Sequence, residues 1–189
     1  MGQIEHSLLL SNTQDRRRIH VLHGLGGIGK TQLAIAYARK YQERYSAILW
    51  LNGNGRDTLV QSLATFARYT EIDGTQKSTI DAVGHGQELS EKANAVLRWL
   101  ALEGNHRWLL VFDNVDRDYQ AEAGDQQAYD LEFFFPGSDH GSVLITTRLP
   151  HLGEYGSATK VTSVDQEQGR QILGNNVRAC LSTSGNRVP

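Results

Sequence analysis

Short apolar runs alternate with longer amphipathic stretches along most of the chain. The apolar runs predict strands, and they cover residues 19–23, 47–51, 108–112 and 143–147, with a short fifth strand over 160–164. Within these runs the apolar positions are nearly continuous and do not alternate strictly with polar ones. Strands of this kind are buried on both sides, so we expect a sheet that is covered on both faces.

The amphipathic stretches between the runs predict helices. Helices are expected over residues 31–45, 58–69, 88–102 and 165–173. In the first of them, Leu33, Tyr37 and Tyr41 recur every four positions and mark one apolar face. Because strands and helices alternate along the chain, we expect an α/β fold with a mainly parallel five-stranded sheet between layers of helices.

The same pattern divides the chain into three parts. Residues 1–18 form a short lead-in that ends in three arginines, for which a solvated loop is expected. Residues 19–173 form one α/β domain, and the polar, aperiodic residues 174–189 are expected to be disordered. Inside the domain, the polar and glycine-containing residues 70–86 are expected to form a mobile loop.

A glycine-rich stretch lies directly between the first strand and the first of these helices. It matches the pattern G-x-x-x-x-G-K-[ST] without a gap and consists of Gly24, Leu25, Gly26, Gly27, Ile28, Gly29, Lys30 and Thr31. Glycines let successive backbone N–H groups turn toward a phosphate, and the positive end of the following helix adds to the attraction. In such a loop the lysine reaches the β- and γ-phosphates and the threonine hydroxyl ligates Mg²⁺.

A chance glycine-rich turn is the alternative to a phosphate-binding loop. Four constrained positions match by chance in roughly 1% of chains of this length. This stretch also lies where a phosphate loop must lie, after an apolar strand and before a helix. We therefore expect the chain to bind a nucleoside di- or triphosphate, within the three-layer sandwich of a P-loop NTPase.

The third strand is followed by Asp113, where phosphate-loop proteins have their second contact to Mg²⁺. The next residue, Asn114, takes the place where many hydrolysing proteins have a carboxylate that activates the attacking water. An amide can orient water by hydrogen bonding, but it is a poor proton acceptor. The sequence leaves open whether Asp116, two residues further on, points back to the site. We expect nucleotide binding with weak or absent hydrolysis.

The fourth strand ends in Thr146, Thr147 and Arg148. An arginine at this place can reach a γ-phosphate and report its presence. The alternative for Arg148 is an exposed side chain at the end of a strand.

Two strings of residues, together with the strand that precedes Asp113, resemble the NB-ARC family. They are residues 23–34, which include Gln32, and residues 141–148. The NB-ARC family comprises signal-transducing nucleotide switches of the STAND class, and the chain is most similar to its fungal NOD-like receptor members. The resemblance covers residues 16–173 and implies a cytoplasmic switch that depends on ATP or ADP.

The resemblance also implies roles for individual residues. Residues 24–32 would hold the phosphates of an adenine nucleotide. Thr31 and Asp113 would hold Mg²⁺, Asn114 would orient water, and Arg148 would sense the γ-phosphate.

Two departures from the family pattern change the expectation. The family usually has a Gly-Arg pair upstream that helps to hold adenine, and residues 1–18 contain no such pair. The family also continues into helical subdomains with Gly-x-Pro and Met-His-Asp motifs, which would follow Pro189. The resemblance therefore predicts a truncated nucleotide-binding core whose protein partners act through missing flanking domains.

Composition and charge exclude several classes of partner and site. The chain has 189 residues and a formal charge of -2, which gives no electrostatic reason to expect nucleic acid or an anionic membrane as a partner. No stretch approaches the ~20 apolar residues of a membrane helix. Cys180 is the only cysteine, so an internal disulfide is impossible and a reducing cytosol is the natural compartment. The histidines lack the paired spacing of a zinc site.

Two functions besides a regulatory switch stay open. The same loop would serve an ATPase or a small kinase with multiple turnover, although no catalytic carboxylate or acceptor site is identifiable. A degenerate fragment without activity is the third hypothesis, motivated by the missing adenine and clamp motifs. Nucleotide binding separates the fragment from the other two, and turnover separates the enzyme from the switch.

Overall fold

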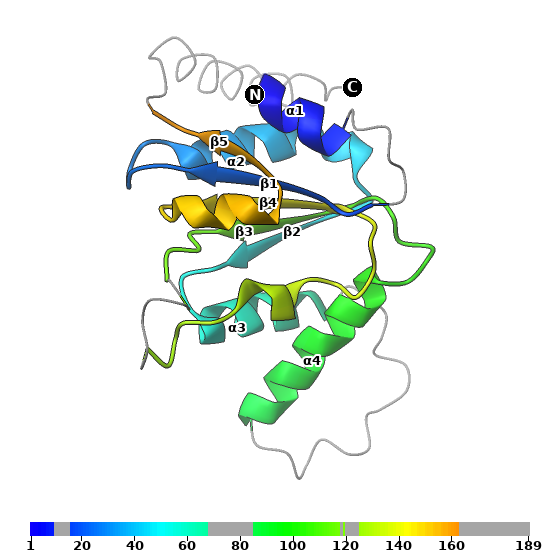
Figure 1. The fold of residues 1–189 in the computed structure, drawn as a ribbon. Helices are drawn as coiled ribbons and strands as arrows, with labels where there is room; N and C mark the ends of the chain where they lie inside the picture. The colour runs from blue at the N-terminus through cyan, green and yellow to red at the C-terminus, as the bar shows by residue number, and fades with distance from the viewer. Residues whose placement is uncertain (10–15, 68–84, 118, 120–124, 163–189) are drawn as a thin grey trace, which may run out of the picture.

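The computed structural model describes residues 1–9, 16–67, 85–117, 119 and 125–162 (Figure 1). Its elements, in chain order, are α1 (Gly2–Leu9), β1 (Arg18–His23), α2 (Lys30–Lys40), η1 (Gln42–Arg44), β2 (Ala47–Asn52), α3 (Arg56–Phe66), α4 (His85–Leu100), β3 (Trp108–Asp113), η5 (Leu131–Phe134), β4 (Ser142–Thr147), η6 (Pro150–Tyr155) and β5 (Ser157–Lys160). The helix expected over 165–173, the tail over 174–189 and most of the loop over 70–86 lie outside the described residues.

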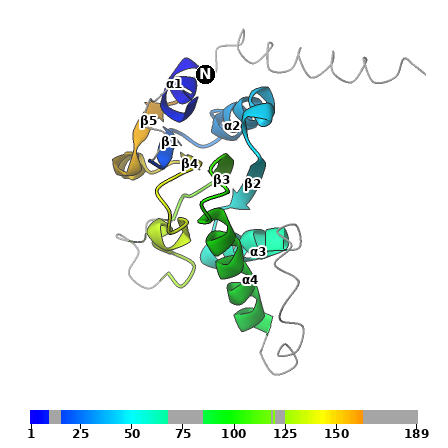
Figure 2. The same cartoon turned by 90° about the vertical axis from the view of Figure 1, so that its right-hand side faces the viewer.

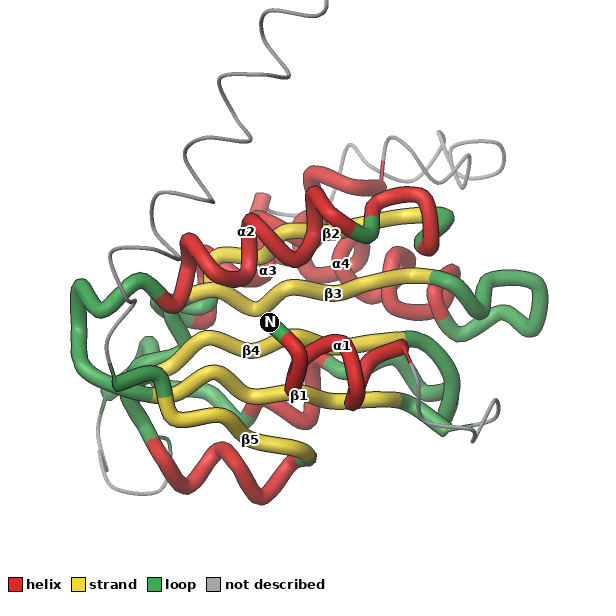
Figure 3. The backbone as a smooth tube through the Cα atoms, turned by 90° about the horizontal axis from the view of Figure 1, so that it is seen from above, coloured by secondary structure: helices red, strands yellow, loops and turns green. Residues whose placement is uncertain are grey.

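Five strands form one sheet in the order β2-β3-β4-β1-β5, and Figure 3 shows them side by side. Every pair of neighbouring strands is parallel. The register brings the strand ends level, with His23 beside Thr147 and Asn52 beside Asp113. The loops after β1, β3 and β4 therefore leave the sheet at one edge, on the left in Figure 1. The predicted α/β class with a parallel five-stranded sheet is confirmed.

Successive residues of the central strands point to opposite faces of the sheet, and helices cover both faces (Figures 1 and 2). Leu109 and Val111 of β3 pack in the apolar cluster beneath α1 and α2. Leu110 and Phe112 of the same strand pack in the cluster formed with α3 and α4. All four side chains are fully buried. This burial on both sides explains why the strand sequences are nearly continuous in apolar residues.

The lead-in contributes a helix, α1, that the sequence analysis did not predict. Ile4 and Leu8 of α1 are each 1% exposed and join the apolar cluster of α2. Glu5 also forms an ion pair with Lys40 of α2, with 2.9 Å between the charged atoms. An eight-residue helix with two buried positions is too short for its periodicity to stand out in the sequence.

The expectation of a solvated loop at the three arginines was wrong for Arg17 and Arg18. Arg17 donates from Nη1 to the carbonyl of Pro136 at 2.9 Å, and its guanidinium lies 4.8 Å from the ring centroid of Phe135. Arg18 begins β1 and donates from Nη1 to the carbonyl of Leu8 at 3.0 Å. Both side chains are partly buried, because an arginine packs its aliphatic stem and planar head against apolar neighbours.

The fifth strand is Ser157–Lys160 and not residues 160–164 as the sequence predicted. It lies at the edge of the sheet, and three of its four residues are exposed. Burial therefore imposes no apolar pattern on this strand. Gly156 precedes it, where a Cβ would lie 2.4 Å from the carbonyl oxygen of Ile19.

A buried histidine, His20, lies on β1 and holds α1 and β5 together. It is 1% exposed. Its Nδ1 lies 2.6 Å from the Ser7 hydroxyl of α1, and its Nε2 lies 3.0 Å from the Thr159 hydroxyl of β5. Burial, together with the charge of the N-terminus, lowers the pKa of His20 to about 4. The imidazole is therefore neutral in the folded protein at neutral pH.

We predict that the free energy of unfolding falls as the pH is lowered from 6.5 toward about 4, and that His20 causes part of this fall. In that window the unfolded chain binds a proton at this histidine and the folded chain does not, so acid favours the unfolded state. Well above pH 6.5 both states are neutral at His20 and its contribution is constant. Denaturant titrations over this pH range measure the slope. His20→Gln should reduce the slope. Equal slopes in wild type and His20→Gln would contradict this account.

Candidate functional site

The glycine-rich loop connects β1 to α2 at the carboxyl edge of the sheet. Gly24, Gly27 and Gly29 have φ angles of 150°, 74° and 100°, which residues with a Cβ rarely adopt. Gly24 also lies against the chain that follows β5, since a Cβ at this position would be 2.5 Å from the carbonyl oxygen of Val161. Backbone geometry alone therefore requires glycine at these three positions of the motif.

Lys30, the first residue of α2, extends its side chain back across the loop. Its Nζ donates to the carbonyl oxygen of Gly24 at 2.9 Å and to that of Leu25 at 2.8 Å. Phosphate oxygens are stronger acceptors for an ammonium than neutral carbonyls because the resulting hydrogen bond joins two ions. The ammonium of Lys30 is thus held on two carbonyl oxygens, and the oxygens of an entering phosphate can replace them as acceptors.

The N-terminus of α2 is open to an anion. Its N-cap is Gly29, which makes no side-chain hydrogen bond, and its first turn contains no acidic residue. The first N–H groups of a helix lack partners within the helix and carry the positive end of its dipole. Together with Lys30, this helix end gives the loop the donors and the charge that fit a phosphate group.

The other residues of the predicted loop have different environments. Ile28 is partly buried and packs against the apolar cluster beneath α2. The side chain of Leu25 is exposed, as is that of Gln32 on α2. Side-chain packing therefore anchors the loop at Ile28, while its tip lies on the molecular surface.

Asp113 joins the loop to two strands. Its Oδ1 accepts a hydrogen bond from the Thr31 hydroxyl at 2.8 Å and another from the Thr146 hydroxyl at 2.6 Å. The structure thus brings Thr31 and Asp113 together, as the predicted magnesium site requires. A hydroxyl and a carboxylate are the hard oxygen ligands that Mg²⁺ prefers, so these residues fit the ion. The contact of Thr146 with Asp113 was not predicted, because in the sequence Thr146 is recognisable only as the end of a strand.

Asn114 has a left-handed backbone, with a φ angle of 66°, which asparagine tolerates better than most residues. Its N–H donates to the Thr146 hydroxyl at 2.9 Å, and its side-chain amide lies 3.4 Å from the Oδ1 of Asn54. Asn54 belongs to the turn after β2. The side chain that follows Asp113 therefore faces a second amide, and neither group is a proton acceptor of useful strength.

Arg148 lies beside the phosphate loop. A Cβ added to Gly26 would lie 3.8 Å from the Cδ of Arg148, so the two residues are in neighbouring positions although the chain separates them widely. The Arg148 side chain is 60% exposed and forms an ion pair with Asp116, whose side chain is 7% exposed. The structure therefore answers the question that the sequence left open, because Asp116 points back toward Arg148.

A buried tyrosine that the sequence analysis did not single out fixes the turn after β2. The Tyr129 hydroxyl donates to the carbonyl of Gly53 at 2.6 Å. Burial raises the pKa of Tyr129, with a smaller effect of the same sign from Asp116. The hydroxyl thus stays protonated as a donor, and the Asn54 turn keeps its place beside Asn114.

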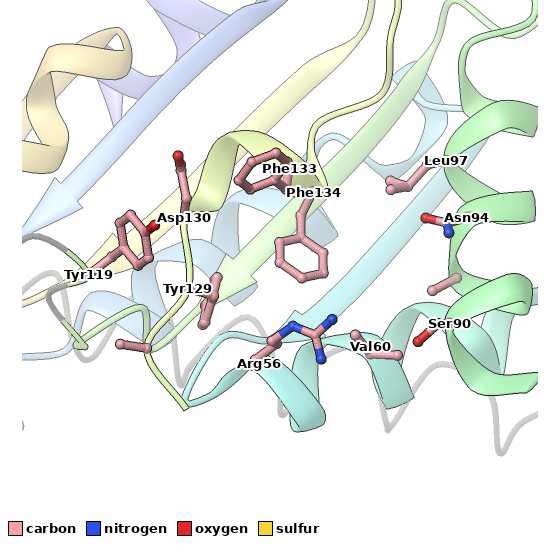
Figure 4. A pocket seen from close by; sticks show the side chains of 12 residues that line it. Arg56, Val60, Ser90, Asn94, Leu97, Tyr119, Tyr129, Asp130, Phe133 and Phe134 are labelled. Carbon is pink, nitrogen blue, oxygen red and sulfur yellow. The ribbon is translucent and has the colours of Figure 1, made fainter. Parts of the chain in front are cut away.

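A cavity of about 440 Å³ lies away from the loop, among α3, α4 and the segment around η5 (Figure 4). Arg56, Asn94, Tyr129 and Phe134 are among the residues that line it. Residues 24–31 contribute no part of its lining. The glycine-rich loop instead lies on the surface before α2, which packs on the opposite face of the sheet.

Two other features are absent from the described residues. Within these residues, the side chains of His, Cys, Asp and Glu form no cluster of three that could hold a metal ion. None of the helices in the described part of the chain has the length and apolar character needed to span a bilayer.

Comparisons with known proteins identify a family and a relative that match most of the chain. Residues 1–180 match the NB-ARC domain. A nucleotide-binding leucine-rich repeat (NLR)-like protein of Hyaloscypha variabilis is 24% identical over 161 residues. That match covers 81% of this chain and 15% of the relative, so the chain spans a small part of the relative's length.

A solved structure supports the fold class. The crystal structure of Cdc6p from Pyrobaculum aerophilum matches with a TM-score of 0.53 and 15% sequence identity. The match covers 94% of this chain and 48% of the other. At this identity the likeness shows a shared fold alone, and it confirms the predicted P-loop NTPase fold.

Proposed function

The chain belongs to the NB-ARC domain family, and we propose that it is an adenine-nucleotide switch that binds ADP or ATP with Mg²⁺. In this proposal residues 24–32 hold the phosphates, and Thr31 and Asp113 hold the Mg²⁺ ion. Arg148 distinguishes ATP from ADP by contacting the γ-phosphate. The switch acts on protein partners through flanking domains, in the cytoplasm.

One observation carries the proposal more than any other. The ammonium of Lys30 lies across the loop on two carbonyl oxygens, at 2.9 and 2.8 Å, next to a helix end that no side chain caps. A full positive charge and free helical N–H groups converge there on a surface loop. A polyphosphate matches both, because its oxygens accept hydrogen bonds and carry negative charge.

The residues near Asp113 favour binding over turnover. Hydrolysis needs a group that takes a proton from the attacking water. Asn114 offers an amide in that place, and Asp116 uses both carboxylate oxygens in hydrogen bonds to Arg148. The proposed switch therefore leaves bound ATP unhydrolysed and changes state mainly by nucleotide exchange.

The relatives support the signalling role without assigning partners. The NLR-like protein of Hyaloscypha variabilis is described by its name as nucleotide-binding, and this chain corresponds to 15% of its length. A domain of this size in a longer relative suits a module that transmits its nucleotide state to neighbouring domains. The proposed partners are accordingly proteins, and neither nucleic acid nor membrane is proposed.

We predict that Lys30→Ala weakens the binding of both Mg²⁺-ADP and Mg²⁺-ATP by at least about tenfold, which corresponds to about 1.4 kcal/mol. The variant removes the charge that faces the phosphates and leaves the β1–α2 turn without its ammonium. Calorimetric titration with each nucleotide measures the dissociation constants. Lys92→Ala is the matched control, because Lys92 lies on α4 and pairs with Glu88. If Lys30→Ala and Lys92→Ala bind nucleotide equally well, the loop is not the site.

We also predict that phosphate release from ATP stays near background under multiple-turnover conditions. The physical reason is the amide of Asn114 in the place of a proton acceptor. A phosphate-release assay on wild type and Asp113→Ala tests this, with Asp139→Ala as a control, because Asp139 is exposed and precedes β4, at the opposite edge of the sheet. Sustained release that is lost in Asp113→Ala and kept in Asp139→Ala would show that the chain is an ATPase.

A further inference from the structure

Asp116 makes two hydrogen bonds to one residue, Arg148. Its Oδ1 accepts from the backbone N–H of Arg148 at 2.6 Å, and its Oδ2 accepts from Nε of the same residue at 2.6 Å. Charge-assisted hydrogen bonds of this length are the strong ones in proteins. Both the backbone and the guanidinium of Arg148 are therefore fixed by a single carboxylate.

The carboxylate itself has little freedom to move. The Asp116 side chain is 7% exposed. The segment before it is bonded to β4 and its end, since Val115 donates to the carbonyl of Thr146 at 2.9 Å and accepts from the Thr147 hydroxyl. The Thr147 hydroxyl also accepts from the N–H of Leu149 at 2.9 Å. Asp116 is thus held at a fixed position relative to the strand end that carries Arg148.

The contact determines which part of the guanidinium can meet a ligand. Arginine has five N–H donors, one on Nε and four on the two Nη nitrogens. Asp116 takes the Nε donor, so the four Nη donors are not used in this ion pair. The Arg148 side chain is 60% exposed, and its Cδ lies 3.8 Å from the position of a Cβ on Gly26. The donor-rich end therefore lies on the open surface beside the phosphate loop.

We infer that Asp116 is a positioning residue for the nucleotide switch. It anchors Arg148 by the backbone N–H and Nε, so that the Nη groups are already directed for the terminal phosphate of a nucleoside triphosphate. This role rests on the proposed function, in which Arg148 senses that phosphate. An arginine without this anchor would lose more rotamer freedom on binding, so the preference for triphosphate over diphosphate would fall.

Asp116→Asn separates the two hydrogen bonds. The oxygen of the new amide can still accept from the Arg148 backbone N–H, but its NH₂ group cannot accept from Nε. The variant therefore keeps the backbone contact of the turn and removes the guanidinium anchor. Glu88→Gln is the control, because Glu88 forms an ion pair with Lys92 on α4, which packs on the face of the sheet opposite α2.

The experiment compares the affinity for a non-hydrolysable ATP analogue with that for ADP, both with Mg²⁺, by calorimetry. We expect Asp116→Asn to lower the ratio of the two affinities by about five- to tenfold, as expected for a lost charge-assisted contact. Glu88→Gln should keep the wild-type ratio. In the background of Arg148→Ala, Asp116→Asn should change the ratio no further, because a positioning residue acts only through the residue that it positions.

Three results would overturn the role of Asp116. An unchanged ratio in Asp116→Asn with a lower melting temperature would reduce Asp116 to a structural residue of the turn. A raised ratio would show that its charge repels the triphosphate. A loss of equal size in the Arg148→Ala background would show that it acts without Arg148. Failure of the proposed function is a distinct result, since wild type would then bind neither nucleotide and both proposals would fall together.

Discussion

The arrangement of the site depends on the hydrogen bonds that the carboxylate of Asp113 accepts. Its Oδ1 receives hydrogen bonds from Thr31 on α2 and from Thr146 on β4, at 2.8 and 2.6 Å. Three segments that are far apart in the chain are joined at this atom. The parallel register makes the junction possible, because the carboxyl ends of all strands share one edge of the sheet. The junction holds the start of α2 against the end of β4.

The site combines a rigid base with an exposed rim. The residues that fix its geometry are buried or nearly so, among them Thr146 and the Asp116 side chain. The groups proposed to meet the nucleotide are more accessible, namely Lys30 and the guanidinium of Arg148. Such a division keeps the donors pre-oriented while a ligand enters from solvent, which reduces the entropy lost on binding. In the proposed switch, the identity of the bound phosphate would change the contacts of Arg148 without repacking the core.

Much of this was predictable from the sequence, and the parts that were not share a physical cause. The glycine-rich turn after β1 and the strands β1 to β4 follow from glycine spacing and from continuous apolar runs, which report backbone geometry and burial directly. The edge strand β5 was misplaced because few of its residues are buried. The pairings of Asp116 with Arg148 and of Asp113 with Thr146 join residues about thirty positions apart. Single residues at that separation leave no periodic signal, so only the fold reveals them.

The central claim is that polyphosphate binds at the turn between β1 and α2. A structure of the chain with Mg²⁺-ADP tests it most directly. The account predicts the β-phosphate within about 3 Å of Nζ of Lys30 and of N–H groups in the loop and the first turn of α2, with Mg²⁺ against Thr31. A β-phosphate bound elsewhere, for example in the cavity between α3 and α4, would contradict it.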